Sequence, residues 1–201
     1  MTSRTKSQWR SEILASRRAV DATTRSAEAD ALAAAAAELG AALGPGATVC
    51  AYVPVGGEPG SVAVLDALAG VVARVLLPVA REPGPLLWAP YRGVNSLVPA
   101  PFGLREPEPP FLPPDTAAEA ALLLIPALAV DRRGVRLGRG AGFYDRTLAL
   151  APETRLVAVV RDSEFVDELP EDPHDVRMHA VLTPGGGLRT VDDQGGQRPA
   201  E

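Results

Sequence analysis

Residues 121–146 read ALLLIPALAVDRRGVRLGRGAGFYDR, and this stretch decides the fold. Its first part, 121–126, is a continuous apolar run of the kind found in strands buried on both faces of a parallel sheet. A loop rich in glycine and arginine follows, and a helical pattern comes next, near 142–150. A buried strand that leads through such a loop into a helix is typical of α/β proteins.

The flanking sequence repeats this alternation of strand and helix. Apolar runs predict further strands at 47–55, 73–79, 86–91, 155–160 and 179–183, and periodic or alanine-rich segments predict helices at 5–20, 24–39 and 61–71. A proline-rich stretch, 98–115, is expected to be a long ordered loop or an edge segment. We therefore predict an α/β fold, in which a mostly parallel sheet carries helices on both faces in a Rossmann-like three-layer arrangement. The first two helices form an N-terminal helical pair.

The composition limits the function classes. Of the 201 residues, 46% are hydrophobic and 22% are charged, which excludes wholesale disorder and a fibrous repeat. The net charge of −5 argues against non-specific nucleic-acid binding, which needs a basic surface. The single cysteine, Cys50, leaves no intramolecular disulfide and no zinc-binding pattern.

The ends of the chain are polar. The N-terminus has no signal-peptide core, and the longest apolar run contains Pro126 and is too short to span a membrane. We therefore expect a cytoplasmic, monomeric protein without nucleic-acid or membrane partners. Residues 1–184 are expected to form one domain, and the glycine-rich, polar residues 185–201 a disordered tail.

The glycine-rich loop is the strongest candidate for a binding site. Gly138, Gly140 and Gly142 would let backbone N–H groups approach an anion closely, and Arg136 and Arg139 would add positive charge. Asp145, at the start of the predicted helix, is a carboxylate that could hold Mg²⁺ against phosphates. The alternative is an ordinary glycine-rich turn with solvated arginines. The loop has neither the Lys-Ser/Thr of a P-loop nor the spacing of a dinucleotide-binding fingerprint.

Two further segments carry candidate residues. Lys6 is the only lysine among 20 basic residues, and it shares one side of the first predicted helix with Arg10. These two cations could bind phosphate oxygens, or they could form an ordinary exposed helix face. Glu58 lies in the loop after the first predicted strand, where α/β sheets place their ligands, although a lone glutamate in a loop is usually solvated.

Together these segments resemble the 5-formyltetrahydrofolate cyclo-ligase family, also called methenyltetrahydrofolate synthetases. The resemblance runs from about Lys6 to Thr183. It rests on Lys6-x-x-Trp9-Arg10, Tyr52-Val53-Pro54 followed by Glu58, Phe102-Gly103-x-x-Glu106-Pro107, the segment IPALAVDRRGVRLGRGAGFYDR, and the late LP-x-x-PHD…VLTP. The Asp-x-x-Gly-x-Arg-Leu-Gly pattern within the glycine segment is the most specific of these.

The resemblance implies a reaction. Members convert 5-formyltetrahydrofolate to 5,10-methenyltetrahydrofolate and hydrolyse ATP to ADP and phosphate. The γ-phosphoryl group activates the formyl oxygen, and N10 of the folate then attacks the formyl carbon. The protein must mainly position the reactants and neutralise moving phosphate charge, which needs cations, a backbone anion cradle and Mg²⁺, but no protein nucleophile.

The resemblance also implies roles for individual residues of this chain. Arg139 and Tyr144 are expected to act catalytically, and Asp145 to hold Mg²⁺. The residues expected to bind ATP are Lys6, Arg10, Arg136, Gly138, Arg139, Gly140, Ala141, Gly142, Phe143, Tyr144 and Asp145. Those expected to bind the folate are Val53, Glu58, Trp88, Phe143 and Tyr144.

Three positions depart from the family pattern. Ala141 stands where many members have glycine or lysine, Phe143 where tyrosine is common, and Glu164 where glutamine is usual. None of the three removes a group that the implied mechanism needs, so we expect activity. Two alternatives stay open: a non-catalytic relative that binds nucleotide or folate, and an enzyme of the same sheet type that acts on a phosphosugar or a coenzyme A ester.

Overall fold

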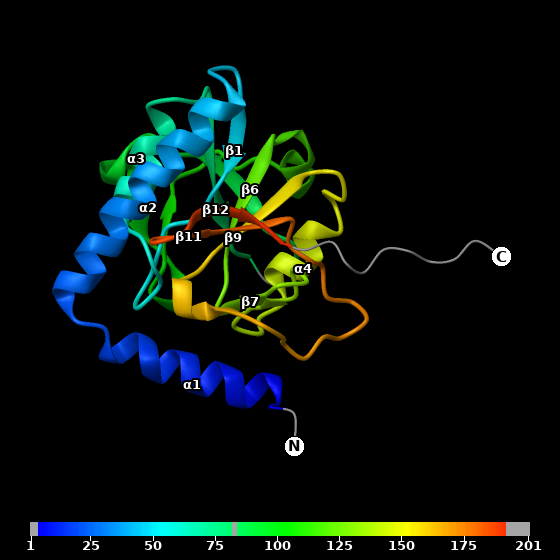
Figure 1. The fold of residues 1–201 in the computed structure, drawn as a ribbon. Helices are drawn as coiled ribbons and strands as arrows, with labels where there is room; N and C mark the ends of the chain where they lie inside the picture. The colour runs from blue at the N-terminus through cyan, green and yellow to red at the C-terminus, as the bar shows by residue number, and fades with distance from the viewer. Residues whose placement is uncertain (1–3, 82–83, 192–201) are drawn as a thin grey trace.

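The computed structural model describes residues 4–81 and 84–191, and its main element is a seven-stranded sheet among these residues. The strands are β1 (Thr48–Cys50), β2 (Arg74–Val79), β3 (Leu87–Pro90), β6 (Leu122–Pro126), β9 (Arg155–Val159), β11 (Ala180–Thr183) and β12 (Gly187–Thr190). They lie in the order β12-β11-β9-β6-β1-β2-β3. The inner strands from β11 to β2 are parallel, and β12 and β3 are antiparallel to their neighbours. The predicted α/β fold with a mostly parallel sheet is confirmed (Figure 1).

Four α-helices lie in the described residues: α1 (Lys6–Ala19), α2 (Ala22–Leu43), α3 (Val62–Ala69) and α4 (Phe143–Leu148). Helix α1 begins at Lys6 because Thr5 caps it. The Thr5 hydroxyl accepts from the Gln8 backbone N–H, and the Gln8 side chain accepts from the Thr5 N–H. The Asp21 carboxylate caps α2 by accepting from the Thr24 N–H. Val20 and Asp21 form the short corner between the helices, so α1 and α2 are separate helices that point in different directions (Figure 1).

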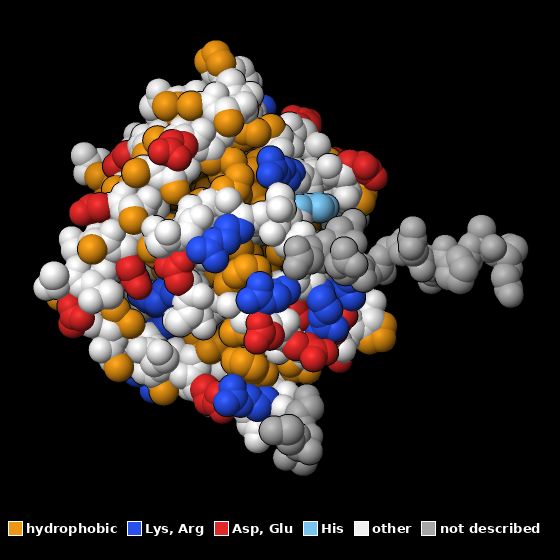
Figure 2. All heavy atoms as spheres, in the orientation of Figure 1, with side chains coloured by type: hydrophobic (Ala, Val, Ile, Leu, Met, Phe, Trp, Pro, Cys, Tyr) orange, Lys and Arg blue, Asp and Glu red, His pale blue; other side chains and the backbone are white. Residues whose placement is uncertain are grey.

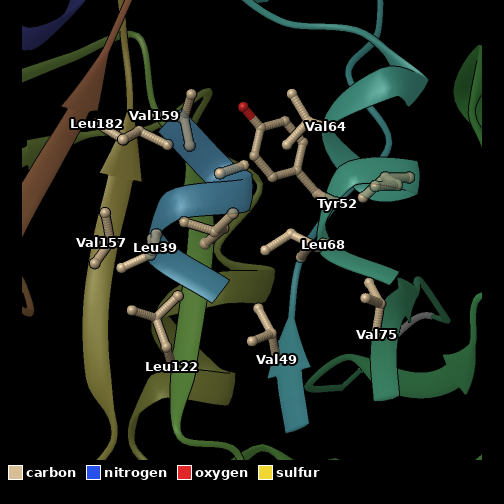
Figure 3. Close-up of a cluster of buried hydrophobic side chains, with 14 of the residues drawn as sticks. Leu39, Val49, Tyr52, Val64, Leu68, Val75, Leu122, Val157, Val159 and Leu182 are labelled. Carbon is tan, nitrogen blue, oxygen red and sulfur yellow. The ribbon is translucent and has the colours of Figure 1, made fainter. Parts of the chain in front are cut away.

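The sheet is buried on both faces, and neighbouring residues of a strand point into opposite cores. Val49 and Leu122 face a core that α2 and α3 cover with side chains such as Leu39 and Leu68 (Figure 3). Cys50 and Leu123, the next residue in each strand, face a second core on the other side of the sheet. The continuous apolar run at 121–126 thus supplies both cores at once.

A third, smaller core lies beneath α1. A short sheet of β7 (Ala129–Asp131), β8 (Arg136–Leu137) and β10 (Phe165–Val166) extends from the end of β6. Ile13 of α1 packs there on Leu128 and Leu137. Figure 1 shows α1 along this region, away from α2 and α3. The N-terminal helix is thereby brought to the end of β6, where the glycine-rich loop begins.

The proline-rich stretch contains short regular segments. It holds β4 (Leu97–Pro99), β5 (Arg105–Pro107) and the 3₁₀ turns η2 (Pro101–Gly103) and η3 (Pro114–Glu119); η1 (Val94–Ser96) precedes it. Strands β4 and β5 pair antiparallel as a two-stranded sheet. The side chain of Glu106 in β5 then accepts from the Ala80 N–H, which ties this segment to the end of β2.

Two details differ from the sequence predictions, and a third, the direction of β3, was left open by the prediction of a mostly parallel sheet. β1 ends at Cys50 rather than at residue 55; beyond it Pro54 has no N–H for a sheet hydrogen bond and Gly56 has φ of +60°, so the chain turns away from the sheet. β3 runs antiparallel to β2 because a parallel return needs a crossover of a dozen or more residues, which the short connection lacks. Gly187–Thr190 form β12 at the start of the predicted tail, paired with β11. The rest of that tail, 192–201, lies outside the described residues.

The described surface carries both signs of charge. Figure 2 shows basic and acidic side chains next to one another on one face. Among the ion pairs of the described surface, Nε of Arg177 lies 2.7 Å from Oε1 of Glu171. No helix in the described part of the chain is long and apolar enough to cross a lipid bilayer.

Candidate active site

A cavity of about 310 Å³ opens beyond the carboxyl ends of β1, β2 and β6. Ligands of parallel α/β sheets bind at this edge, and the volume lies in the usual range for small-molecule sites. Three parts of the chain enclose most of it. They are the loop after β1, the end of β2 together with the neighbouring strand β5, and the glycine-rich loop that leads into α4. The lining residues are Tyr52, Val53, Val55, Glu58, Pro78, Ala80, Leu86, Leu104, Arg105, Glu106, Pro126–Leu128, Arg136 and Gly138–Asp145.

Arg136 is the fixed cation of this cavity. It lies in β8, its side chain is 7% exposed, and its Nη2 donates to Oδ1 of Asp145 at 2.7 Å. Its Nε is buried without a hydrogen-bond partner in the described structure. A Cβ at Gly138 would lie 2.8 Å from Nη1 of Arg136, so glycine at this position leaves room for the guanidinium to pack over the loop. Strand β8 and Gly138 together place the Arg136 guanidinium in the cavity wall.

The glycine-rich loop depends on backbone angles that favour glycine. Gly140 has φ of +97° and Gly142 has φ of +74°, in the left-handed region where other residues are strained. Helix α4 begins directly after Gly142. The loop therefore lies flat against the cavity, and the structure places Gly138 through Asp145 in its wall, Ala141 included.

Two aromatic rings at the start of α4 complete this wall. Phe143 and Tyr144 both line the cavity, and the Arg136 guanidinium lies 5.7 Å from the centre of the Tyr144 ring. Arg146 stacks over Phe143 at 5.1 Å. Burial, and then the negative charge of Glu58, raises the pKa of Tyr144 well above its usual range. Tyr144 is therefore a neutral phenol that can donate and accept hydrogen bonds.

Glu58 approaches the cavity from the opposite wall. Its Oε2 accepts from the Val55 N–H at 3.0 Å, and its Oε1 lies 3.2 Å from Nη2 of Arg139. The Glu58 side chain is 8% exposed, whereas that of Arg139 is 52% exposed. Val53, from the same loop, also lines the cavity. One ion pair thus joins the β1 loop to the glycine-rich loop.

The N-terminal helix meets the site at its rim. Arg10 Nε donates to the Gly138 carbonyl at 3.0 Å, which places its guanidinium beside the glycine-rich loop. Lys6 does not line the cavity; its Nζ lies 2.7 Å from Asp172 and 2.6 Å from Asp175. Burial alone would lower the pKa of Lys6, but the hydrogen bonds and charges of the two carboxylates outweigh it and raise that pKa. In turn, Lys6 lowers the pKa of Asp172.

Trp88 corrects one of the sequence predictions. It does not line the cavity but is 1% exposed in the second core, and its Nε1 donates to the Pro114 carbonyl at 3.2 Å. Strand β3 is apolar along its whole length, so the sequence did not indicate which face Trp88 would take. Trp88 is a core residue and does not line this cavity.

The sequence reasoning missed two groups of residues. Glu106 of β5 lies in the cavity wall, where Ala80 N–H and Arg81 donate to its carboxylate. The Phe-Gly-x-x-Glu-Pro pattern that contains it was the available signal. Asp172, His174 and Asp175 form an acidic group whose ligand atoms lie within 4.8 Å of one another. The PHD pattern marks their position, but nothing in it predicts the contact with Lys6.

The model of the 5-formyltetrahydrofolate cyclo-ligase family matches residues 2–184 of this chain. The chain belongs to that family. A curated cyclo-ligase from Mycolicibacterium smegmatis is 56% identical over 194 residues, which cover 94% of this chain and 98% of the relative. The Escherichia coli cyclo-ligase is 32% identical over 141 residues, 68% of this chain and 78% of its own length.

The fold agrees with this membership. The solution structure of the 5,10-methenyltetrahydrofolate synthetase of Aquifex aeolicus matches with a TM-score of 0.73 at 22% identity, covering 98% of this chain and 96% of that one. The synthetase of Mycoplasma pneumoniae matches with a TM-score of 0.69 at 18% identity, covering 94% and 99%. The family and the ATP-dependent cyclo-ligase function expected from the sequence are confirmed.

The cyclo-ligase fold also explains the glutamate at position 164. Glu164 is buried, and its two oxygens accept from Nε and Nη2 of Arg17, each at 2.7 Å. A glutamine could offer only one of these oxygens. The carboxylate therefore matches the buried guanidinium of Arg17 and lies outside the cavity wall.

Proposed function

We propose that this cyclo-ligase binds ATP and 5-formyltetrahydrofolate in the single cavity described above and converts them to 5,10-methenyltetrahydrofolate, ADP and phosphate. The observation that supports this most directly is that two different walls of the cavity, the glycine-rich loop and the loop after β1, face each other and are joined by the Arg139–Glu58 ion pair. Cations and positive-φ glycines lie on one side, Glu58 lies on the other, and Arg139 reaches between them. Such a site can hold a phosphate donor and a polar heterocycle next to each other.

The phosphate wall supplies charge and backbone donors. Arg136 is buried beside the loop and Arg10 lies at its rim, so both can neutralise phosphate oxygens. In the loop Gly138–Gly142, the three glycines have no Cβ atoms that would keep a triphosphate from the backbone. In this proposal Lys6 leaves its carboxylate partners when ATP is bound and adds a further cation from α1.

The folate wall supplies one carboxylate and apolar contacts. Glu58 is held by the Val55 N–H, and it would accept hydrogen bonds from N–H groups of the pterin ring. Val53, Phe143 and Tyr144 offer flat or branched apolar surface for the ring system. Tyr144, as a neutral phenol, can hydrogen-bond the formyl oxygen or the transferred phosphoryl group.

With both substrates held in the cavity, the reaction needs the formyl oxygen to lie next to the γ-phosphorus of ATP. The formyl oxygen attacks the γ-phosphorus, the bond to the β-phosphate oxygen breaks, and ADP leaves. N10 attacks the formyl carbon and loses its proton, and the C–O bond breaks to release phosphate and leave the methenyl cation. The Arg139 side chain is 52% exposed and is not packed in the core, so in this proposal it moves from Glu58 to the transferring phosphoryl group. No protein nucleophile is needed.

The residues around Asp145 fit Mg²⁺. Mg²⁺ usually takes one or two carboxylates together with phosphate oxygens and water, and Asp145 offers a cavity-lining carboxylate that is 39% exposed. Arg136 already occupies Oδ1 and holds the side chain in place. When bound, the metal would supply charge neutralisation between the phosphates. We propose further that the enzyme works as a monomer in the cytoplasm.

A direct assay tests this function. Purified protein, 5-formyltetrahydrofolate and MgATP should give the near-ultraviolet absorbance of the methenyl product, with one ADP formed per product. Omitting ATP or Mg²⁺, or replacing Glu58 by Ala, should remove or weaken the signal. Intact MgATP binding without product would instead favour the non-catalytic relative.

A further inference from the structure

A chain of four charged side chains, three of them buried and the fourth, Glu28, partly exposed, lies behind the folate wall. Arg17 of α1 pairs with Glu164, Glu164 lies near Arg161, and Arg161 pairs with Glu28 of α2. The side chains of Arg17, Glu164 and Arg161 are 3%, 6% and 7% exposed, respectively. Arg161 follows β9 and precedes the 3₁₀ turn η4 (Asp162–Glu164), at the same edge of the sheet as the cavity. None of these four residues lines the cavity.

A gain in folding stability does not by itself explain why these charges are buried. Burying charges costs solvation energy, and well-packed apolar side chains often serve equally well. One nitrogen of the cluster, Nη1 of Arg17, is even buried without a hydrogen-bond partner among the described residues. A role in holding a neighbouring segment in place is a better explanation for these charges.

Arg161 is the member that reaches toward the folate wall. Its Nε donates to both oxygens of Glu28, at 3.0 and 2.8 Å, and its Nη1 donates to the Gly57 carbonyl at 2.8 Å. Its own backbone N–H donates to Glu164 at 2.8 Å. The guanidinium is thus held by Glu28 on one side and, on the other, donates to the carbonyl of the residue directly before Glu58.

The loop that carries Glu58 has few other anchors. Within the described chain, the hydrogen bonds made by 55–60 are internal, between Val55 and Glu58, except for the bond from Arg161 and the ion pair with Arg139. Gly56 has φ of +60° and Gly60 has φ of +93°, so the loop has glycines on both sides of Glu58. Gly57 packs closely on α1, since a Cβ there would lie 3.2 Å from Cβ of Arg17.

We propose that Arg161 is a positioning residue for the folate: it holds the Gly57 carbonyl and thereby keeps the Glu58 carboxylate at the cavity wall. Glu28 and Glu164 orient Arg161 for this task. The inference rests on the proposed role of Glu58 as a folate ligand. It assigns to Arg161 a larger effect on folate affinity than on ATP affinity, because Arg161 contacts the Glu58 loop directly and reaches the proposed ATP-binding wall only through other ion pairs.

The test compares the effect of an Arg161 variant on the KM for 5-formyltetrahydrofolate with its effect on the KM for MgATP. Replacing Arg161 by Met keeps the apolar length of the side chain and removes the bond to Gly57. The variant should raise the KM for 5-formyltetrahydrofolate about tenfold while leaving the KM for MgATP within about twofold, as expected for a misplaced substrate-binding group. Arg133→Met is the matched control. Arg133 also joins a buried carboxylate, Asp131, to a backbone carbonyl, that of Leu169, but it is remote from the Glu58 loop.

A double-variant cycle with Glu58→Ala distinguishes positioning from general destabilisation. If Arg161 acts through Glu58, Arg161→Met should raise the folate KM no further once Glu58 is Ala. An unchanged folate KM in Arg161→Met, or a full additional rise in the Glu58→Ala background, would overturn the inference. If Glu58→Ala alone left the folate KM unchanged, the role proposed for Glu58 would fail as well.

A milder variant covers the case in which Arg161→Met does not fold. Arg161→Lys keeps the positive charge but has no fork that can reach Glu28 and Gly57 at once. It should show the same selective rise in the folate KM, with a thermal midpoint close to that of the wild type. Equal changes in both KM values would overturn the proposal.

Discussion

Arg139 bridges the two walls of the cavity: its Nη2 lies 3.2 Å from Oε1 of Glu58. The two loops that bind different substrates in the proposed function therefore share an ion pair. Bound ATP would compete with Glu58 for the Arg139 guanidinium. The buried Glu58 carboxylate would then lack its partner and would gain more from the N–H groups of the folate ring.

The first prediction is that nucleotide and folate bind cooperatively. A non-hydrolysable ATP analogue with Mg²⁺ should tighten the binding of 5-formyltetrahydrofolate by about fivefold or more, a common size for coupling between sites. In Arg139→Gln this coupling should disappear, because Glu58 is unpaired with or without nucleotide. Isothermal titration of folate into protein, with and without the analogue, measures it. Equal folate affinities in wild type would refute the exchange of Arg139 between partners.

The second prediction concerns the two cations of α1. Arg10→Ala and Lys6→Ala should each raise the KM for ATP about tenfold, since a hydrogen bond between charged groups contributes about 1.5–3 kcal/mol. The folate KM should change much less. Arg18→Ala, an exposed position on the same helix, is the control. ATP kinetics that stay normal in both variants would reduce α1 to a structural role.

The main features of fold and site are readable from the sequence because they depend on local patterns. The apolar run at 121–126 supplies both faces of a central strand, and the alternating cores at Leu122 and Leu123 follow from it. Gly140 and Gly142 are glycines because their φ angles require it. The loop position of Glu58 follows from the end of β1.

The remaining features depend on contacts between distant residues. Lys6 meets Asp172 and Asp175 across more than 160 positions of sequence, and no local pattern predicts that meeting. The same holds for Arg17 and Glu164, which join α1 to η4. Trp88 was misplaced because an all-apolar strand gives no sign of which face is the cavity side.

The third prediction concerns the metal. Asp145→Asn keeps the size of the side chain and removes its charge, so Mg²⁺ should bind more weakly at this place. We expect a lower rate and a rise in the Mg²⁺ concentration needed for half-maximal activity. A titration of activity with Mg²⁺ at saturating ATP measures both. Unchanged Mg²⁺ dependence would place the metal on other residues, for which Asp172 and Asp175 are the next candidates.

The fourth prediction concerns pH. Burial and the charge of Glu58 raise the pKa of Tyr144, so the phenol stays neutral in the folded enzyme through and beyond pH 10, the ordinary value for tyrosine. Tyr144→Phe should therefore lower kcat without moving the alkaline limb of the pH–rate profile. The neutral phenol favours the folded state below about pH 10, and this contribution is lost as the pH rises from there toward the folded pKa. A shifted alkaline limb in Tyr144→Phe would show that Tyr144 does ionise during the reaction.

The last prediction concerns Asp131, the buried carboxylate that shapes the turn before the glycine-rich loop. Asp131 is fully buried and accepts from the backbone N–H groups of Arg133, Val135 and Leu169. Asp131→Ala would leave these donors without an acceptor in the interior and would remove one of the partners of the Arg133 side chain. We expect a loss of about 3 kcal/mol in the free energy of unfolding.

Urea unfolding at pH 7 measures this loss, and Asp167→Ala provides the control. Asp167 is 90% exposed and pairs with Arg132 at the surface, so its removal should cost less than about 1 kcal/mol. Equal losses in the two variants would mean that the three backbone donors find other acceptors. A large loss confined to Asp131 would show that this one carboxylate holds the turn that leads to Arg136.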